Sequence, residues 1–272
     1  GLLTAITAVE CLRAIGHDWQ EIALIVGSEE EIGSPVTRHW LAELAPRFDA
    51  GLVLEAARAN GNVVTGRKGG GFWQVRVDGV AAHAGVEPEA GASALLQLAH
   101  TALAVDRVND SVPGASVVIG TAKAGEAPNM VPPTAEMTID GRAWTLDALE
   151  EMETAIRDAV EGAQRTIPGT STQLTGGVIK AVMERGEGPL GLYERARAIG
   201  DAIGIELGEQ STGGTSDANF LAAGGLAVLD GLGPVGGKTH TQDEYVETAS
   251  IVPRTALLAG LIADLTGPSL PR

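Results

Sequence analysis

The stretch Ile22-Ala23-Leu24-Ile25-Val26-Gly27-Ser28-Glu29-Glu30-Glu31 decides the predicted fold. Its first five residues are all apolar, which predicts a β-strand that is covered on both faces, as in a parallel sheet. Helical periodicity predicts one helix before this strand, over residues 2–15, and another after it, over residues 36–44. A second apolar run at residues 51–54 predicts another short buried strand. This alternation indicates an α/β fold with a largely parallel sheet flanked by helices.

A different pattern begins at Gly69-Gly70-Gly71. Residues 72–77 alternate between apolar and polar side chains, which predicts a strand with one exposed face. The elements expected next are a helix, two strands, a helix and a strand, at residues 92–105, 116–122, 135–144, 146–163 and 171–174. This β-α-β-β-α-β order is typical of a ferredoxin-like α+β unit.

The α/β pattern returns beyond Gly177, so the ferredoxin-like unit is expected to be an insertion into the first domain. The later elements are predicted as a helix, a strand and a helix, at residues 190–203, 226–229 and 251–265. The predicted organisation has three segments: the first part of the α/β domain, the inserted domain and the second part of the α/β domain, at residues 1–67, 68–177 and 178–272.

Composition limits the classes of partner. The chain has 272 residues, 44% of them hydrophobic, and 19 Lys and Arg against 35 Asp and Glu give a formal net charge of −16. This charge disfavours nucleic-acid phosphates and anionic membranes and favours metal cations. The single cysteine, Cys11, excludes cysteine-rich zinc sites, so any zinc must be held by His and carboxylates. No apolar run reaches the roughly 18 residues that span a bilayer, and nothing at Gly1 resembles a signal peptide, so we expect a soluble cytoplasmic protein.

Three candidate site segments each follow a predicted strand: the carboxylates Glu29–Glu31, the carboxylate Glu55, and His240 in the last third of the chain. Ligands of open α/β sheets bind just beyond the carboxyl ends of strands. Carboxylate oxygens and an imidazole nitrogen suit zinc or a similar divalent ion. Each segment also has an ordinary explanation: a solvated acidic loop, an acid at a helix N-terminus, or a surface histidine.

Six sequence motifs lie in a recognisable order: EEEIGS at 29–34, LVLE at 52–55, AAHAGVEPEAG at 81–91, APNMVP at 127–132 with DGR at 140–142, TGGTSDAN at 212–219, and THT at 239–241. Together they resemble the dizinc metallopeptidases of the glutamate carboxypeptidase, aminoacylase and succinyl-diaminopimelate desuccinylase family, with the glutamate carboxypeptidase branch most similar. The resemblance covers nearly all 272 residues. It implies a zinc-peptidase-like catalytic domain with an inserted lid and dimerisation domain.

The resemblance also implies roles for the carboxylates and the histidine. Glu30 is implied as the general base, Glu31 and His240 as ligands of one metal, and Glu55 as a ligand of the other. The implied metals are two divalent ions, zinc first, with cobalt or manganese as alternatives. Such a pair lowers the pKa of a bridging water and polarises the scissile carbonyl. This reading requires Glu31, Glu55 and His240 to converge beside Glu30.

In the lid, the resemblance implies that His83 stabilises the oxyanion in the active site of a neighbouring subunit of a homodimer. Arg142 is implied to grip the free carboxylate of the substrate, a task suited to a two-pronged donor. Its ordinary alternative is a structural ion pair with Asp140. Further substrate contacts are implied for Asn129, Gly214 and Thr215.

The family also uses a His in a Gly-His-x-Asp setting and a bridging Asp in an Asp-x-Lys-Gly setting, and neither motif occurs in this sequence. We expect those ligands to come from another segment or chain. The expected function is a metal-dependent hydrolase that cleaves the amide bond of a C-terminal, acidic amino acid or of an N-acylated one. The alternatives are a deacylase or desuccinylase of small N-acyl amino acids and, from another class, a non-catalytic dimerising remnant.

Overall fold

The computed structural model describes residues 1–267 and divides the chain into two compact units. Unit 1 contains Gly1–Arg67 and the chain from Met183 onward, and unit 2 contains Lys68–Val182. Arg67 and Met183 are hydrogen-bonded to each other through both backbones, with N···O distances of 2.8 and 3.1 Å. Unit 2 ends at Val182 rather than at the expected residue 177, because strand β6 (Ser171–Lys180) continues through that point.

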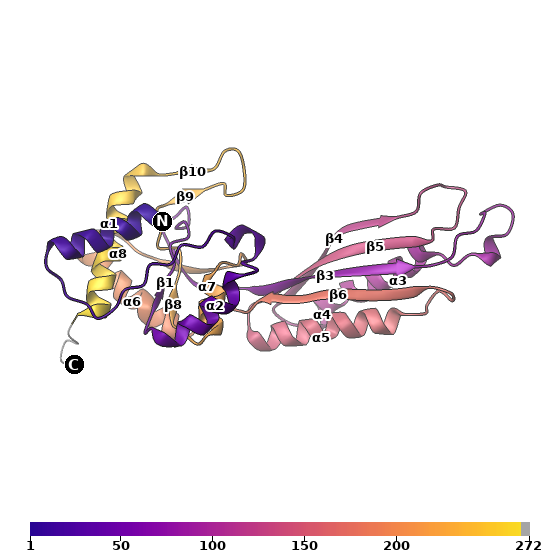
Figure 1. Ribbon diagram of the computed structural model, residues 1–272, viewed down its shortest axis with the longest axis horizontal. Coiled ribbons are helices and arrows are strands. Elements are labelled where there is room, and N and C mark those ends of the chain that lie inside the picture. The colour runs from indigo at the N-terminus through magenta and orange to yellow at the C-terminus, as the bar shows by residue number, and fades with distance from the viewer. Residues whose placement is uncertain (268–272) are drawn as a thin grey trace. The chain divides into compact units, whose positions relative to one another are not determined.

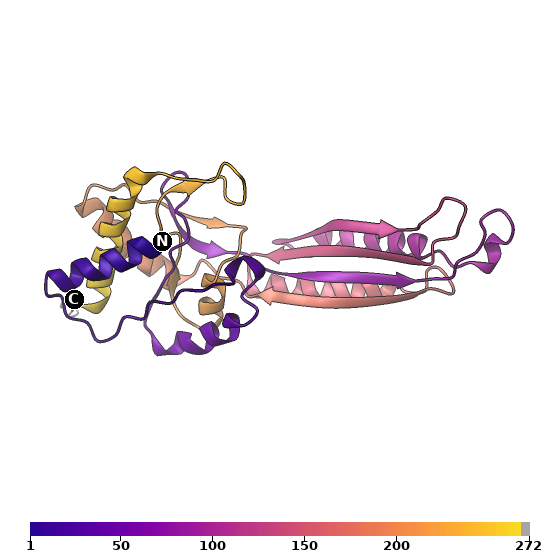
Figure 2. The same ribbon diagram turned by 45° about the horizontal axis from the view of Figure 1, so that its top comes forward.

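Unit 2 is a four-stranded antiparallel sheet with two long helices, α3 and α5, on one face (Figures 1 and 2). The strand order is β4-β5-β3-β6. The elements before β6 are β3 (Gly69–Asp78), a 3₁₀ turn (Pro88–Ala90), α3 (Ala94–Asp106), α4 (Val108–Ser111), β4 (Ala115–Ala124), β5 (Thr134–Ala143) and α5 (Leu146–Ala163). This arrangement confirms the predicted ferredoxin-like unit.

The alternating sequence of β3 explains how unit 2 forms its core. Trp73, Val75 and Val77 are buried and point to the helix-covered face, while the residues between them are exposed. Ser93 and Thr145 accept hydrogen bonds from backbone N–H groups in the first turns of α3 and α5. The core of unit 2 is therefore closed between one face of the sheet and two capped helices.

Unit 1 contains shorter strands between helices. Its first part contains α1 (Leu2–Ala14), a 3₁₀ turn (Glu30–Ile32), α2 (Thr37–Leu44), a second 3₁₀ turn (Ala45–Arg47), β1 (Gly51–Leu52) and β2 (Val63–Arg67). Its second part contains α6 (Glu187–Ala202), β7 (Glu209–Thr212), α7 (Ala218–Ala223), β8 (Val228–Leu229), β9 (Gly236–Gly237), β10 (Tyr245–Val246) and α8 (Thr248–Thr266). The pairs β1–β8 and β2–β7 are parallel, and β9–β10 is antiparallel.

The predicted strand at residues 22–26 is wrong. This segment belongs to no helix or strand in the part of the chain that the structure describes, and every residue of it except the half-buried Ile22 is exposed, with Val26 at 66%. The prediction assumed that neighbouring strands cover both faces. Among residues 1–267 the segment has no ladder partner, so apolar character alone does not make it a strand. The parallel pair β2–β7 was not predicted, because neither strand is a pure apolar run.

Helix α8 lies in the core of unit 1 beside α1 and α6. By length and composition alone it is long and apolar enough to cross a membrane, which corrects the expectation that no segment reaches that length. The helix also contains a buried charge, Arg254, which donates to the carbonyls of Gly61 at 3.1 Å, Gly233 at 3.0 Å and Gly231. Burial lowers the pKa of Arg254 to about 10, so the guanidinium is still charged at neutral pH. These contacts are those of a core helix.

Candidate metal centre

The acidic turn, residues 27–34, gives its three glutamates different surroundings. The Glu29 carboxylate accepts hydrogen bonds from the backbone N–H of Thr37 at 2.6 Å and of Val36 at 2.9 Å, so it caps the start of α2. The Thr37 backbone N–H is the main cause that lowers the pKa of Glu29. Glu30 and Glu31 lie in the 3₁₀ turn that follows. The carboxylate of Glu29 is thus used to cap helix α2, whereas Glu30 and Glu31 belong to the 3₁₀ turn between Glu29 and that helix.

His240 contacts the acidic turn from the other end of the chain. Its Nε2 lies 3.1 Å from Oε2 of Glu31, and both side chains are largely exposed. His240 and Lys238 have φ angles of +64° and +56°, in the left-handed region that residues other than glycine seldom adopt. Such backbone strain is common at functional sites, where surrounding structure maintains it. The structure therefore brings together two of the residues that the sequence predicts as ligands of one metal.

Glu55 lies just beyond strand β1, and its carboxyl is partly buried. Burial is the largest cause that raises the pKa of Glu55, followed by the charge of Asp230. The charges of Glu30 and Glu31 raise this pKa further, whereas the charge of Arg67 lowers it. Negative charge therefore gathers around Glu55, in an environment that a cation would stabilise.

Two carboxylates and an imidazole form a donor set that fits zinc or a similar divalent ion. The contact between Glu31 and His240 supports one half of such a site. Within residues 1–267, however, no three His, Cys, Asp or Glu side chains gather closely enough to hold a metal ion. The donor chemistry of a metal site is present, while the described residues gather only a pair of ligands.

The glycine-rich loop after β7 contains the predicted substrate contacts Gly214 and Thr215 in unit 1. The Gly214 carbonyl accepts a hydrogen bond from Nη1 of Arg67 at 2.8 Å. Arg67 in turn forms a buried ion pair with Asp230, with Nε and Oδ2 2.6 Å apart. Our sequence reasoning missed this pair. Asp230 follows the apolar run 226–229 directly, the same signal that singled out Glu55, so it could have been found.

The predicted lid residues lie in unit 2, where His83 and Asn129 are neighbours. His83 forms an isolated antiparallel bridge with Met130, and the Ala84 N–H donates to the carbonyl of Asn129 at 2.9 Å. The His83 ring is exposed, and its Nδ1 accepts from the Gly85 N–H at 3.1 Å. This bond orients the imidazole toward its own loop.

Arg142 lies near the other end of the same sheet. It occurs at the end of β5, whose 10 residues begin shortly after Asn129. A strand of that length extends about 30 Å, so unit 2 does not bring Arg142 together with His83 and Asn129. Arg142 Nη2 pairs with Oδ2 of Asp140 at 2.9 Å, and this hydrogen bond is the main cause that raises the pKa of Arg142. The structural ion pair expected as the alternative for Arg142 is therefore present.

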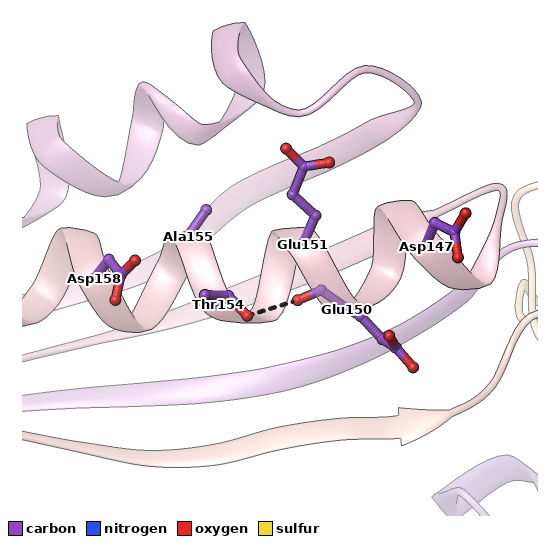
Figure 3. A pocket seen from close by; sticks show the side chains of 6 residues that line it. All are labelled: Asp147, Glu150, Glu151, Thr154, Ala155 and Asp158. Carbon is purple, nitrogen blue, oxygen red and sulfur yellow. Dashed lines mark hydrogen bonds between the residues drawn. The ribbon is translucent and has the colours of Figure 1, made fainter.

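A shallow hollow on the outer face of α5 is also acidic. It is lined by Asp147, Glu150, Glu151, Thr154, Ala155 and Asp158 (Figure 3). Glu150 and Glu151 point to opposite sides of the helix in this view. The hydroxyl of Thr154 donates to the backbone carbonyl of Glu150 at 3.0 Å, a bond within the helix itself. These carboxylates diverge, so the hollow is a solvated helix face and does not resemble a ligand site.

The sequence is similar to those of several known hydrolases. Residues 65–167 match the family model described as the peptidase dimerisation domain of the M20 type. Carboxypeptidase G2 of a Pseudomonas species is 30% identical over 253 residues, which cover 92% of this chain and 60% of that protein. The succinyl-diaminopimelate desuccinylase of Alkalilimnicola ehrlichii is 30% identical over 278 residues, which cover 96% of this chain and 72% of that protein. The chain thus spans less than two thirds of carboxypeptidase G2.

Solved structures show the same fold. The aminopeptidase PepT of Bacillus cereus superposes with a TM-score of 0.82 at 21% sequence identity, covering 98% of this chain and 70% of that one. A tripeptidase of Staphylococcus aureus superposes with a TM-score of 0.81 at 18% identity, covering 97% of this chain and 69% of that one. An α/β fold with an inserted ferredoxin-like unit is thus common to this chain and to peptidases of low sequence identity.

Proposed function

Because this chain belongs to the M20 peptidase family, we propose that the protein is a metal-dependent hydrolase of amide bonds, with zinc as the first expected metal. The observation that carries the proposal is the 3.1 Å contact between Glu31 and His240, two residues far apart in sequence, beside the predicted base Glu30. Glu55, with its neighbouring negative charges, supports a second cation.

In the proposed mechanism, Glu31 and His240 would hold one metal and Glu55 would contribute to holding the other. When bound, such metals lower the pKa of a water and polarise the scissile carbonyl. Glu30 would take a proton from the attacking water, whose oxygen adds to the carbonyl carbon, and would give that proton to the amine nitrogen as the C–N bond breaks. The backbone of the loop at Gly214 and Thr215 contacts the substrate, and His83 of a partner subunit stabilises the oxyanion.

The proposed substrate is a peptide or amide that ends in an acidic amino acid, or an N-acylated amino acid. The relative named a carboxypeptidase supports cleavage at a C-terminal residue, and the relative named a desuccinylase supports an N-acylated amino acid. The acidic side chain is proposed from the family resemblance alone. Arg142 is the proposed partner of the substrate carboxylate; in this structure it is paired with Asp140, so binding would exchange one carboxylate for another. The proposed location is the cytoplasm.

We also propose that the protein is a homodimer formed through unit 2, which contains most of the matched dimerisation domain. Helix α3 exposes Leu96 and Leu103, seven residues apart and so on one helix face. Strand β4 lies at the edge of the sheet, and an exposed edge is suited to pairing with another chain.

The test is metal content and turnover of the natural full-length protein. After zinc loading we expect bound metal and hydrolysis of an N-acyl glutamate, of N-succinyl-diaminopimelate, or of both. The Glu30→Gln variant should retain the metal and lose turnover by about 10²-fold or more, because a carboxamide cannot accept the proton. The His240→Ala variant should lose metal. Absence of metal in every preparation would support the non-catalytic alternative, and near-normal turnover in Glu30→Gln would show that the base is wrongly assigned.

A further inference from the structure

One carboxylate, that of Asp217, lies against both ends of the acidic turn. The buried hydroxyl of Ser34, at the end of the turn, donates to Oδ1 of Asp217 at 2.6 Å. Gly27, at the start of the turn, is so close that an added Cβ would lie 3.3 Å from Oδ2 of the same residue. Ser34 also has a φ of +49°, a strained conformation that its surroundings must maintain. Both ends of the turn that contains Glu30 and Glu31 thus contact one side chain, Asp217, from the second half of the sequence.

Asp217 belongs to a loop that is itself tied to a buried ion pair. The side chains of Arg67 and Asp230 are only 4% and 0% exposed. Arg67 donates to the Gly214 carbonyl at 2.8 Å, and the hydroxyl of Ser216 donates to Oδ2 of Asp230 at 2.7 Å. The loop is therefore held at Gly214 and Ser216, on the N-terminal side of Asp217.

The loop is also fixed on the other side of Asp217. The Ala218 N–H donates to the Ser216 hydroxyl at 3.1 Å, and the Ser216 N–H donates to Oδ1 of the buried Asn219 at 2.9 Å. Buried, satisfied polar networks of this kind make a unique local conformation. The position of the Asp217 carboxylate is consequently defined by contacts that reach the core of unit 1.

We propose that Asp217 is a positioning residue that, through Ser34, holds the acidic turn in the geometry in which Glu30 and Glu31 act, and that the Arg67–Asp230 pair holds Asp217. The inference rests on the proposed function for what the turn does. The mechanical link itself rests only on the hydrogen bonds and the buried pair. The same hydrogen bonds connect the loop at Gly214, a proposed substrate contact, to the acidic turn, because both contact the network around Arg67 and Asp230.

The first experiment measures hydrogen exchange in the acidic turn. The N–H groups of Gly33 and Ser34 donate to Glu30 and Glu29 carbonyls at 2.9 and 3.0 Å, so their exchange reports the order of the turn. We expect Asp217→Ala and Ser34→Ala to speed this exchange by about tenfold, the effect of losing one buried hydrogen bond. Asp217→Asn retains an acceptor at Oδ1 and should stay close to wild type.

The matched control is Asp264→Ala, which removes another carboxylate of unit 1, one that forms a surface pair with Arg195 at 2.9 Å. It should leave exchange in the turn unchanged. Unchanged exchange in folded Asp217→Ala, or equal effects of Asn and Ala at this position, would overturn the link. Ser34→Ala removes the donor of the same Ser34–Asp217 hydrogen bond. The link can therefore be tested even when one of the two variants does not fold.

The second experiment separates positioning from a purely structural role. In the metal-loaded full-length protein, Asp217→Ala should lower kcat by about tenfold to a hundredfold with little change in KM, because a displaced turn misplaces the base. Full kcat in a variant with fast exchange in the turn would overturn the positioning role. If the wild-type protein hydrolyses neither substrate, the proposed function fails, while the exchange experiment still decides whether Asp217 holds the turn.

Discussion

Glu55 combines burial with nearby negative charge, and its pKa is raised for both reasons, burial being the larger. A carboxyl whose pKa is higher in the folded than in the unfolded state lowers the free energy of unfolding once the pH exceeds the pKa of the unfolded state. Above that pH the unfolded chain ionises the group more readily than the folded protein does. At lower pH both states are protonated and the cost disappears. Glu55, one of the proposed metal ligands, is therefore a source of instability when no metal is bound.

We predict that Glu55→Gln raises the denaturation midpoint of the metal-free protein at pH 7 and leaves it nearly unchanged at pH 4, below the usual pKa. Urea denaturation at the two pH values measures this. Glu43→Gln, an exposed glutamate of α2, is the control and should have little effect at either pH. With saturating zinc the sign should reverse, since the variant then loses a ligand. A destabilised metal-free Glu55→Gln at pH 7 would contradict the prediction.

Strands β3 and β6 approach each other closely at glycines. Gly176 has a φ of +92°, and an added Cβ would lie 2.1 Å from the carbonyl oxygen of Phe72, a backbone atom that cannot move aside cheaply. The sheet of unit 2 therefore depends on a position without a side chain.

We predict that Gly176→Ala destabilises the protein by about 2 kcal/mol or more, from backbone strain together with steric overlap. Gly162→Ala is the matched control, because this glycine lies inside α5 with no atom near its added Cβ. That substitution should stabilise by up to about 1 kcal/mol, the difference in helix propensity. Chemical denaturation followed by circular dichroism compares the two, and equal effects would refute the argument.

Helices and strands were predicted correctly where the local sequence pattern alone determines the element. The alternation in β3 and the amphipathic α5 require only their own unit as context, and unit 2 was predicted in the observed order. The strand at residues 22–26 was predicted wrongly because whether an apolar run becomes a strand depends on neighbours that its own residues do not encode. For the candidate site, Glu31 and His240 were singled out by motif, whereas Asp217 and Arg67 act through hydrogen bonds that only folding reveals.

At the scale of the whole molecule, exposed apolar side chains on unit 2 favour association with a second copy of the chain. Leu96 and Leu103 are 55% and 63% exposed on α3. Burying two such side chains in an interface removes apolar surface from water and favours a second copy. Strand β4 adds a sheet edge on the same unit, and no strand pairs with that edge among residues 1–267.

We predict that Leu96→Glu with Leu103→Glu weakens dimerisation by about a hundredfold or more, equivalent to about 2.7 kcal/mol. Light scattering over a range of concentrations measures the change, with the wild-type protein expected as a dimer. Leu146→Glu, an exposed leucine at the start of α5, is the control and should leave the dimer intact. A monomeric wild type, or equal effects of the two replacements, would contradict an interface on α3.

The reciprocal backbone bonds between Arg67 and Met183 have a consequence for how this chain can change over evolution. Hydrogen-bonded antiparallel neighbours have Cα atoms only about 5.5 Å apart, a gap that a two-residue hairpin turn closes. Replacing residues 68–182 by a short turn would therefore leave the path of the rest of unit 1 unchanged. Lineages that exchange this insertion would keep the backbone of unit 1, with Glu31, Glu55 and His240, and would have to replace the roles proposed for His83 and Arg142.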